Sequence, residues 1–154
     1  MKVLFICLGN ICRSPMAEGL FRHHVSALGI NHHFEIDSCG TGSWHAGELP
    51  DPRMRNTAIR NGIKLTHCAR QIKNSDFEYY DHLLVMDHMN YSDVVALSPL
   101  HKEKVSLVTN YSKNYTGQII PDPYFGDMEG FKKVFDLLDN VTSEIAQHFY
   151  QQYR

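Results

Sequence analysis

The stretch VLFICLGNICRSP, residues 3–15, joins an apolar run to a short turn and then to residues typical of a helix start. Residues 2–7 are nearly all apolar, as expected for a strand buried on both faces of a parallel sheet. Ser14 and Pro15 have the side chains of an N-cap and a first helical residue, and apolar residues follow at helical spacing until Gly29. The stretch therefore predicts the first strand–helix unit of an α/β fold.

The same alternation continues along the chain. Further strands are predicted at 34–38, 81–87 and 104–109, and helices at 52–61, at 91–97 and from 126–127 onward. This order predicts a parallel sheet with helices on both faces, with ligands bound beyond the carboxyl ends of its strands. The chain has 154 residues without a repeat or linker, so residues 1–154 are predicted to form one domain.

Composition excludes several functions. The net charge is −2, which does not suggest a nucleic-acid-binding protein. No run approaches the ~18 apolar residues of a membrane helix, and the start is too short for a signal peptide, so no membrane association and a cytoplasmic location are predicted. The four cysteines form no C-x-x-C pair and the ten histidines no H-x-x-x-H pair. The sequence therefore predicts no metal site and no cofactor.

The turn after the first strand is suited to binding a phosphate group. Gly9 and Asn10 allow unusual backbone angles, and the N–H groups before a helix, with their partial positive charge, can converge on one anion. Arg13 adds a guanidinium that matches two phosphate oxygens. These positive groups favour a thiolate at Cys7, which could attack a phosphate monoester, and Ser14 can donate a hydrogen bond to the same sulfur. The competing interpretation is an ordinary turn with a buried, inert cysteine.

A nucleophilic thiolate needs a partner that moves protons. The leaving oxygen requires an acid and the phosphocysteine requires an activated water, and one carboxyl group can act in both steps. Asp122, in the loop IIPDPYFGD at 119–127, is the candidate because two prolines stiffen its position. The alternative is a proline turn with an exposed carboxylate of no special role.

Together these segments resemble the low-molecular-weight protein tyrosine phosphatases. The resemblance covers essentially the whole chain and is strongest at CLGNICRSPMAE, residues 7–18. SWHAGELPDPR (43–53), HCARQI (67–72), MDHMN (86–90) and DPYFGD (122–127) support it in the same order. The resemblance implies a three-layer, flavodoxin-like fold with four parallel strands in the order 2-1-3-4. It also implies hydrolysis of phosphotyrosine and aryl phosphate monoesters through a phosphocysteine intermediate.

The resemblance assigns roles to individual residues. Cys7 would be the nucleophile, Arg13 the phosphate clamp and Asp122 the proton donor. Asn10 would hold the loop in shape with the help of Ser38 and His67. The residues expected to bind substrate are Leu8, Gly9, Asn10, Ile11, Cys12, Ser14, Trp44 and Tyr124. The expected partners are phosphotyrosine-containing proteins, and the expected state is a monomer with weak self-association possible through Tyr124 and Phe125.

Three related activities compete with this interpretation. A thiol-dependent arsenate reductase would need a further cysteine pair near residues 80–90, and YYDHLLVMDHMN (79–90) has none. A non-catalytic phosphopeptide-binding module or redox sensor would not need Asp122. Some bacterial relatives that resemble protein-arginine phosphatases carry threonine in the loop, so Ile11 favours tyrosine.

The second loop cysteine suggests a protective function. If the loop brings Cys12 within disulfide reach of Cys7, an oxidised Cys7 could be rescued as a reversible disulfide. This is a hypothesis about redox sensitivity, and it gives Cys12 a function different from that of Cys7.

Overall fold

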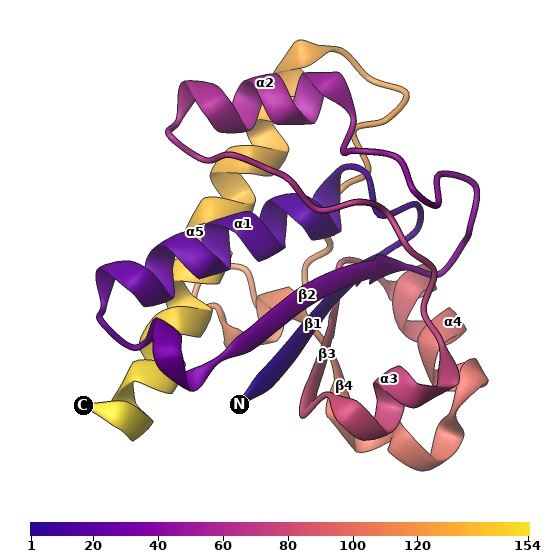
Figure 1. Ribbon diagram of the computed structural model, residues 1–154, viewed down its shortest axis with the longest axis vertical. Coiled ribbons are helices and arrows are strands. Elements are labelled where there is room, and N and C mark those ends of the chain that lie inside the picture. Colours follow the sequence, from indigo (N-terminus) through magenta and orange to yellow (C-terminus); the bar gives the residue numbers. More distant parts are fainter.

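The computed structural model describes all residues 1–154 and has a four-stranded parallel sheet at its centre (Figure 1). The strands are β1 (Lys2–Cys7), β2 (Glu35–Gly40), β3 (His82–Val85) and β4 (Val105–Leu107). Their order across the sheet is β2-β1-β3-β4, which confirms the predicted order 2-1-3-4. β1 lies in the interior of the sheet, so the loop that follows Cys7 starts between two neighbouring strands.

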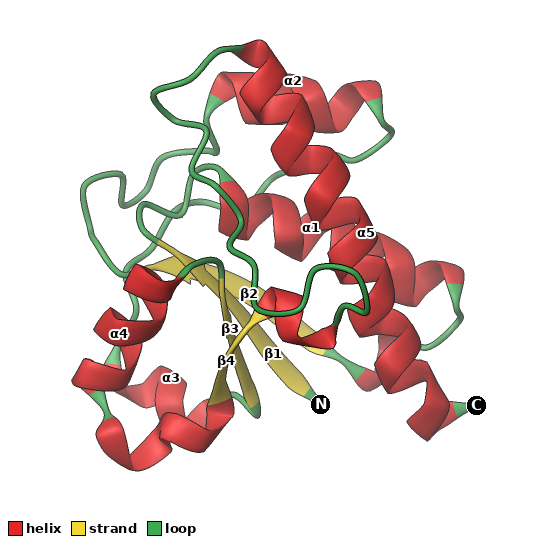
Figure 2. Cartoon of the chain, turned by 180° about the vertical axis from the view of Figure 1, so that it is seen from behind, coloured by secondary structure: helices red, strands yellow, loops and turns green.

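Helices cover both faces of the sheet (Figure 2). The helices α1 (Arg13–Ala27) and α5 (Met128–Tyr153) pack on one face, with α2 (Pro52–Arg60) against α5. The shorter helices α3 (Asn74–Tyr79) and α4 (His88–Leu97) lie on the other face. Three 3-10 turns complete the chain, at Asn31–His33, Pro99–Lys104 and Val108–Tyr111. No helix combines the length and the apolar character needed to cross a membrane.

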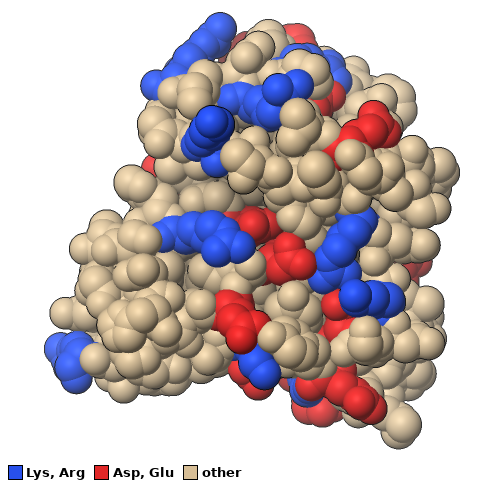
Figure 3. Space-filling model, viewed as in Figure 1, with Lys and Arg blue, Asp and Glu red and all other residues tan.

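Alternating side chains of the strands create two separate hydrophobic cores. Val3 and Phe5 point into the larger core, which α1, α2 and α5 complete. Leu4 and Ile6 point into the smaller core with α3 and α4. All four side chains are fully buried, which explains the nearly continuous apolar run of residues 2–7. On the face shown in Figure 3, acidic and basic side chains are interspersed over this framework.

The structure corrects three local predictions. Ser14 is not an N-cap: α1 begins at Arg13 after Cys12, and no side chain caps it. The helix α3 was not predicted, because it is only six residues long and shows no helical periodicity in sequence. The predicted strand 104–109 is shorter than expected, since the chain leaves the sheet after Leu107 and forms a 3-10 turn. The uncapped start of α1 leaves its N–H groups available to an anion.

Candidate active site

The site forms where loops from all four strands meet at one edge of the sheet. The loop after β1 is joined to the loop after β2 by hydrogen bonds from Thr41 N to Cys7 O (2.9 Å) and from Gly42 N to Leu8 O (2.9 Å). The loop before α5 joins the end of β3 through Ile120 N and Met86 O, 2.8 Å apart. Together they enclose a cavity of about 200 Å³. This is smaller than the ~300–1,000 Å³ of typical small-molecule pockets, so it suits a side-chain head group.

The Cys7 thiol lies at the base of this cavity and is only 3% exposed. Its sulfur is 3.0 Å from Ser14 Oγ, and it accepts a hydrogen bond from the backbone N–H of Asn10 at 3.3 Å. Both groups can donate to a negative sulfur, and the uncapped N-terminus of α1 follows within the same loop. Two possible hydrogen-bond donors and a helix N-terminus therefore lie close to the Cys7 sulfur. Ser14 does not cap α1, but its predicted contact with the sulfur is present.

The second loop cysteine has a different environment. Cys12 is also buried, and burial together with the negative charge of Asp51 raises the pKa of its thiol far above the usual range. Cys12 is therefore a neutral thiol at neutral pH, although it lines the same cavity. The structure thus places Cys12 in an environment that opposes ionisation of its thiol.

Asn10 combines an unusual backbone conformation with four side-chain hydrogen bonds. Its φ is +57°, the left-handed region, and it is the only non-glycine residue with positive φ. Its side-chain amide donates to Ser14 Oγ (2.8 Å) and Ser38 Oγ (3.0 Å). Its oxygen accepts from His67 Nε2 (2.8 Å) and from the backbone N–H of Arg70 (3.0 Å). These four bonds bring together Asn10, Ser38 and His67, as predicted.

A layer of charged groups supports this network from outside. His67 Nδ1 lies 3.2 Å from Asp37 Oδ1 and 3.5 Å from Glu18 Oε1. Burial alone would raise the pKa of Asp37, but bonds from His67 and the Ser38 N–H, together with the charge of Arg70, lower it to about 2. Glu18, Asp37 and His67 are close enough to hold a metal ion, with ligand atoms within 4.8 Å of one another. Their contacts with one another and with Asn10, Ser38 and Arg70 explain the cluster as a hydrogen-bonded network.

Arg13 is held rigidly beside the thiol. Its side chain is 3% exposed, and one guanidinium nitrogen donates to Asp87 Oδ2 (2.7 Å) and to the carbonyl of Ile120 (2.9 Å). Burial acts to lower the pKa of Arg13, but the negative charges of Cys7, Asp87 and Asp122 raise it overall. Arg13 therefore stays charged in a water-poor site, where it can act on a phosphate.

Asp87 was missed by the sequence reasoning. It is the N-cap of α4, where its other oxygen accepts from Asn90 N at 2.7 Å. One carboxylate thus both starts a helix and orients Arg13. Its position as the last residue of the predicted strand 81–87, at the edge where ligands bind, was the available signal.

Asp122 lies across the cavity from the thiol, on the loop before α5. Its carboxyl group is 39% exposed, 3.6 Å from Arg13, and it accepts from the N–H of Tyr124 at 3.1 Å. Arg53 of α2, also missed by the sequence reasoning, donates to the carbonyl of Tyr124 at 3.0 Å and pairs with Asp51. Because Asp51 N donates to Ile11 O (2.8 Å), this pair connects the Asp122 loop to the Cys7 loop.

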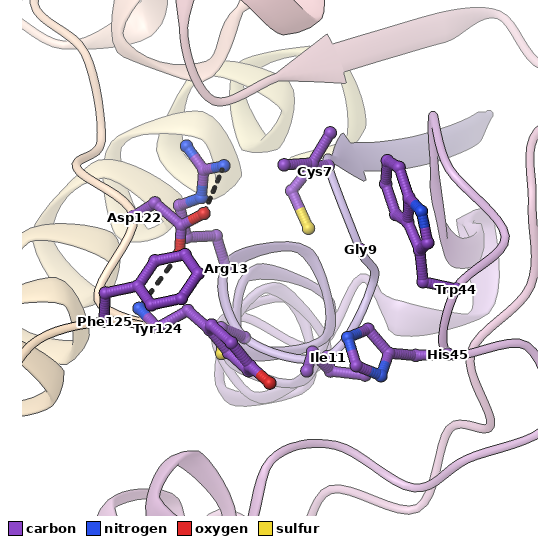
Figure 4. A pocket seen from close by; sticks show the side chains of 11 residues that line it. Cys7, Gly9, Ile11, Arg13, Trp44, His45, Asp122, Tyr124 and Phe125 are labelled. Atoms are coloured by element: carbon purple, nitrogen blue, oxygen red, sulfur yellow. Dashed lines mark hydrogen bonds and ion pairs between the residues drawn. The ribbon is translucent and has the colours of Figure 1, made fainter.

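Aromatic rings form the walls of the cavity (Figure 4). Trp44 and His45 stand on one side of the Cys7 sulfur, with Tyr124 and Phe125 on the other. Trp44 is 70% exposed and Phe125 is 95% exposed, so these rings mark the rim while the sulfur lies at the base. Leu8, Gly9, Ile11 and Cys12 complete the lining, so six of the eight predicted binding residues border the cavity. The other two, Asn10 and Ser14, are buried and do not line it.

Comparisons with known proteins agree with this geometry. A family model described as low molecular weight phosphotyrosine protein phosphatase matches residues 2–153. The Schizosaccharomyces pombe protein of that name is 44% identical over 152 residues, covering 95% of this chain and 97% of the relative. The human protein is 40% identical over 137 residues, covering 87% of this chain and 86% of the relative.

Solved structures give the same result. A protein tyrosine phosphatase from Entamoeba histolytica superimposes with a TM-score of 0.94 at 32% identity, covering 100% of this chain and 99% of that one. A Drosophila arginine phosphatase superimposes with a TM-score of 0.87 at 33% identity, covering 97% and 98%. Both chemistries therefore occur on folds similar to this one.

Proposed function

Because the chain belongs to the low molecular weight phosphotyrosine protein phosphatase family, whose members are hydrolases acting on phosphoproteins, we propose that Cys7, Arg13 and Asp122 carry out its reaction. The observation that supports these roles is the convergence of a hydrogen-bonded thiol, a buried guanidinium and a partly exposed carboxyl group on one cavity. A non-catalytic phosphopeptide-binding module would not need the carboxyl group of Asp122.

In the first step, the Cys7 thiolate attacks phosphorus and the bond to the tyrosine oxygen breaks. Protonated Asp122 gives its proton to the leaving oxygen, so that tyrosine departs as a neutral phenol. Arg13 and the N–H groups at the start of α1 stabilise the charge on the transferred phosphoryl oxygens. These groups supply the positive charge at the reaction centre, so we expect turnover to persist in EDTA.

In the second step, the ionised Asp122 takes a proton from a water molecule, which attacks the phosphocysteine. The sulfur–phosphorus bond breaks, inorganic phosphate leaves and the Cys7 thiolate is restored. The bonds from Ser14 and from Asn10 N to the sulfur favour this step, because they stabilise the leaving thiolate. One carboxyl group therefore serves both steps in alternating protonation states.

The depth of the cavity supports a preference for aryl phosphates. The phosphate would lie at the base beside a sulfur that is 3% exposed, with the aromatic rim above it. A phenyl ring can span this depth between Trp44 and Tyr124, whereas the side chain of phosphoserine is too short. Ile11, an apolar residue of the lining, further favours a flat ring over the polar guanidinium of phosphoarginine.

The test compares phosphotyrosine, phosphoserine and phosphoarginine peptides, together with para-nitrophenyl phosphate, in EDTA. We expect phosphotyrosine to be hydrolysed best, vanadate to inhibit, and Cys7→Ser to lose turnover while still binding vanadate. Turnover by Cys7→Ser at the parental rate would refute the assignment of Cys7 as the nucleophile. Hydrolysis of the phosphoarginine peptide faster than that of the phosphotyrosine peptide would refute the preference for phosphotyrosine.

We further propose that residues 1–154 act as one cytoplasmic domain that is mainly monomeric and binds neither nucleic acid nor membranes. The exposed ring of Phe125 is the feature that could support weak self-association. Sedimentation of the parent and of Phe125→Ser over a range of concentrations tests the oligomeric state. A stable dimer of the parent at low concentration would contradict the mainly monomeric state.

A further inference from the structure

A second groove lies next to the catalytic cavity. It has a volume of about 300 Å³, and Leu8 and Trp44 line both hollows. Its other wall comes from α4, through Asp93 and Leu97, and its floor includes Gly42. The proposed reaction does not use this groove, although its wall Trp44 also borders the place where the tyrosine ring would bind.

The indole of Trp44 is held in place by a backbone contact. A Cβ atom added to Gly42 would lie only 1.8 Å from Cζ3 of the indole, so the ring packs directly on the glycine. The ring nevertheless remains 70% exposed. Trp44 is therefore positioned by Gly42 and still presents most of its surface for contact with a ligand.

The groove carries an uncompensated negative charge. Asp93 is exposed, and none of the ion pairs in the structure involves it. No lysine or arginine lines the groove. An exposed indole beside a free carboxylate suits a cation on an aliphatic stem, because a guanidinium or ammonium group is attracted by both. Leu97, 53% exposed, offers an apolar surface for the methylene groups of that stem.

We propose that this groove is a substrate subsite for an arginine or lysine side chain within two residues of the phosphotyrosine. This proposal rests on the proposed function, which places the tyrosine ring on the other side of Trp44. Successive residues of an extended peptide are ~3.3 Å apart, so a long basic side chain can reach the neighbouring groove. The phosphatase would then select phosphotyrosine sites by a nearby basic residue.

The experiment uses phosphotyrosine peptides with one arginine placed at each position from −2 to +2. Each is compared with a peptide carrying citrulline, the neutral analogue of arginine, at the same position. At the best position we expect arginine to raise kcat/KM by about 5- to 10-fold, as an exposed ion pair and a cation–π contact together would give. The effect should lie mainly in KM, because the contact forms before the reaction and persists through it.

Asp93→Asn should reduce the arginine preference to about 2- to 3-fold, since only the cation–π contact would remain. Asp136→Asn, the same change on the exposed surface of α5, is the matched control and should leave the preference unchanged. Neither variant should alter turnover of para-nitrophenyl phosphate, which does not reach the groove. An arginine preference as large in Asp93→Asn as in the parent, or no preference at any position, would overturn the subsite.

Binding measured without turnover separates this proposal from the proposed function. Trp44 is the only tryptophan, so its fluorescence reports peptide binding to Cys7→Ser. Tighter binding of the arginine peptide than the citrulline peptide, reduced on adding Asp93→Asn, supports the subsite even if the catalytic roles are wrong. Equal binding of the two peptides refutes the subsite even if the parent hydrolyses both.

Discussion

Replacing Asn10 should release the nucleophile loop from its active shape. Asn10 combines a left-handed backbone, with φ of +57°, and four side-chain hydrogen bonds that connect the loop to Ser14, Ser38, His67 and Arg70. Two substitutions separate these contributions. Asn10→Gly keeps the backbone freedom and loses the four bonds, whereas Asn10→Ala loses the bonds and also disfavours the left-handed conformation.

The magnitude follows from the contacts that are lost. Four buried or partly buried hydrogen bonds contribute a net ~0.5–1.5 kcal/mol each, so Asn10→Gly should cost about 2–6 kcal/mol in the free energy of unfolding. Asn10→Ala should cost about 1 kcal/mol more, because a Cβ atom is unfavourable at this φ. If returning the loop of a variant to its phosphate-binding conformation costs about 3 kcal/mol, the variant should bind phosphate ~10²-fold more weakly than the parent.

Three measurements test this reasoning. Urea unfolding gives the two losses of stability, inhibition by vanadate gives the affinity of the loop for an oxyanion, and kcat/KM for para-nitrophenyl phosphate gives the catalytic consequence. We expect Asn10→Ala to be less stable than Asn10→Gly, to bind vanadate less tightly and to have the lower kcat/KM. If Asn10→Ala binds vanadate and turns over like the parent, the network does not hold the loop. If Asn10→Gly matches the parent while Asn10→Ala does not, backbone strain alone matters and the side-chain bonds do not.

Three further predictions concern individual side chains. Asp122→Asn should lower kcat by about 10²–10⁴, and more for phenyl phosphate than for para-nitrophenyl phosphate, whose leaving group needs less protonation; equal losses would contradict its function as an acid. Asp37→Asn should destabilise the protein at neutral pH but not at pH values near 2. Its folded pKa of about 2 lies below the ordinary 3.8, so its contribution is complete above 3.8 and disappears as pH falls toward 2; calorimetry over this range checks this. After peroxide and then thiol treatment, the parent should regain more activity than Cys12→Ser; equal recovery would show that Cys12 does not protect Cys7.

Much of the fold was predictable because the relevant interactions are local or periodic. Continuous apolar strands such as residues 2–7 require burial on both faces, and the strand–helix alternation then favours a parallel sheet. The helix α3 was missed because its six residues are stabilised by tertiary contacts, including a buried Phe77, rather than by a helical pattern. Ser14 was assigned two functions, a helix cap and a hydrogen-bond donor to the Cys7 sulfur, and only the contact with the sulfur forms in the folded loop.

The sequence by itself determined the loop that carries Cys7 and Arg13, because eight consecutive residues contain the nucleophile, the guanidinium and the helix start. Only the tertiary structure decided how that loop is supported. Asp87, which orients Arg13, lies 74 positions further along the chain, and His67, which bonds to Asn10, lies 57 positions after it. The tertiary structure also gave Cys7 and Cys12 different surroundings. The burial and the charge of Asp51 that keep Cys12 neutral arise only after folding. Contacts of this kind depend on which strand ends meet at one edge of the sheet, and local sequence patterns do not encode which distant residues come together there.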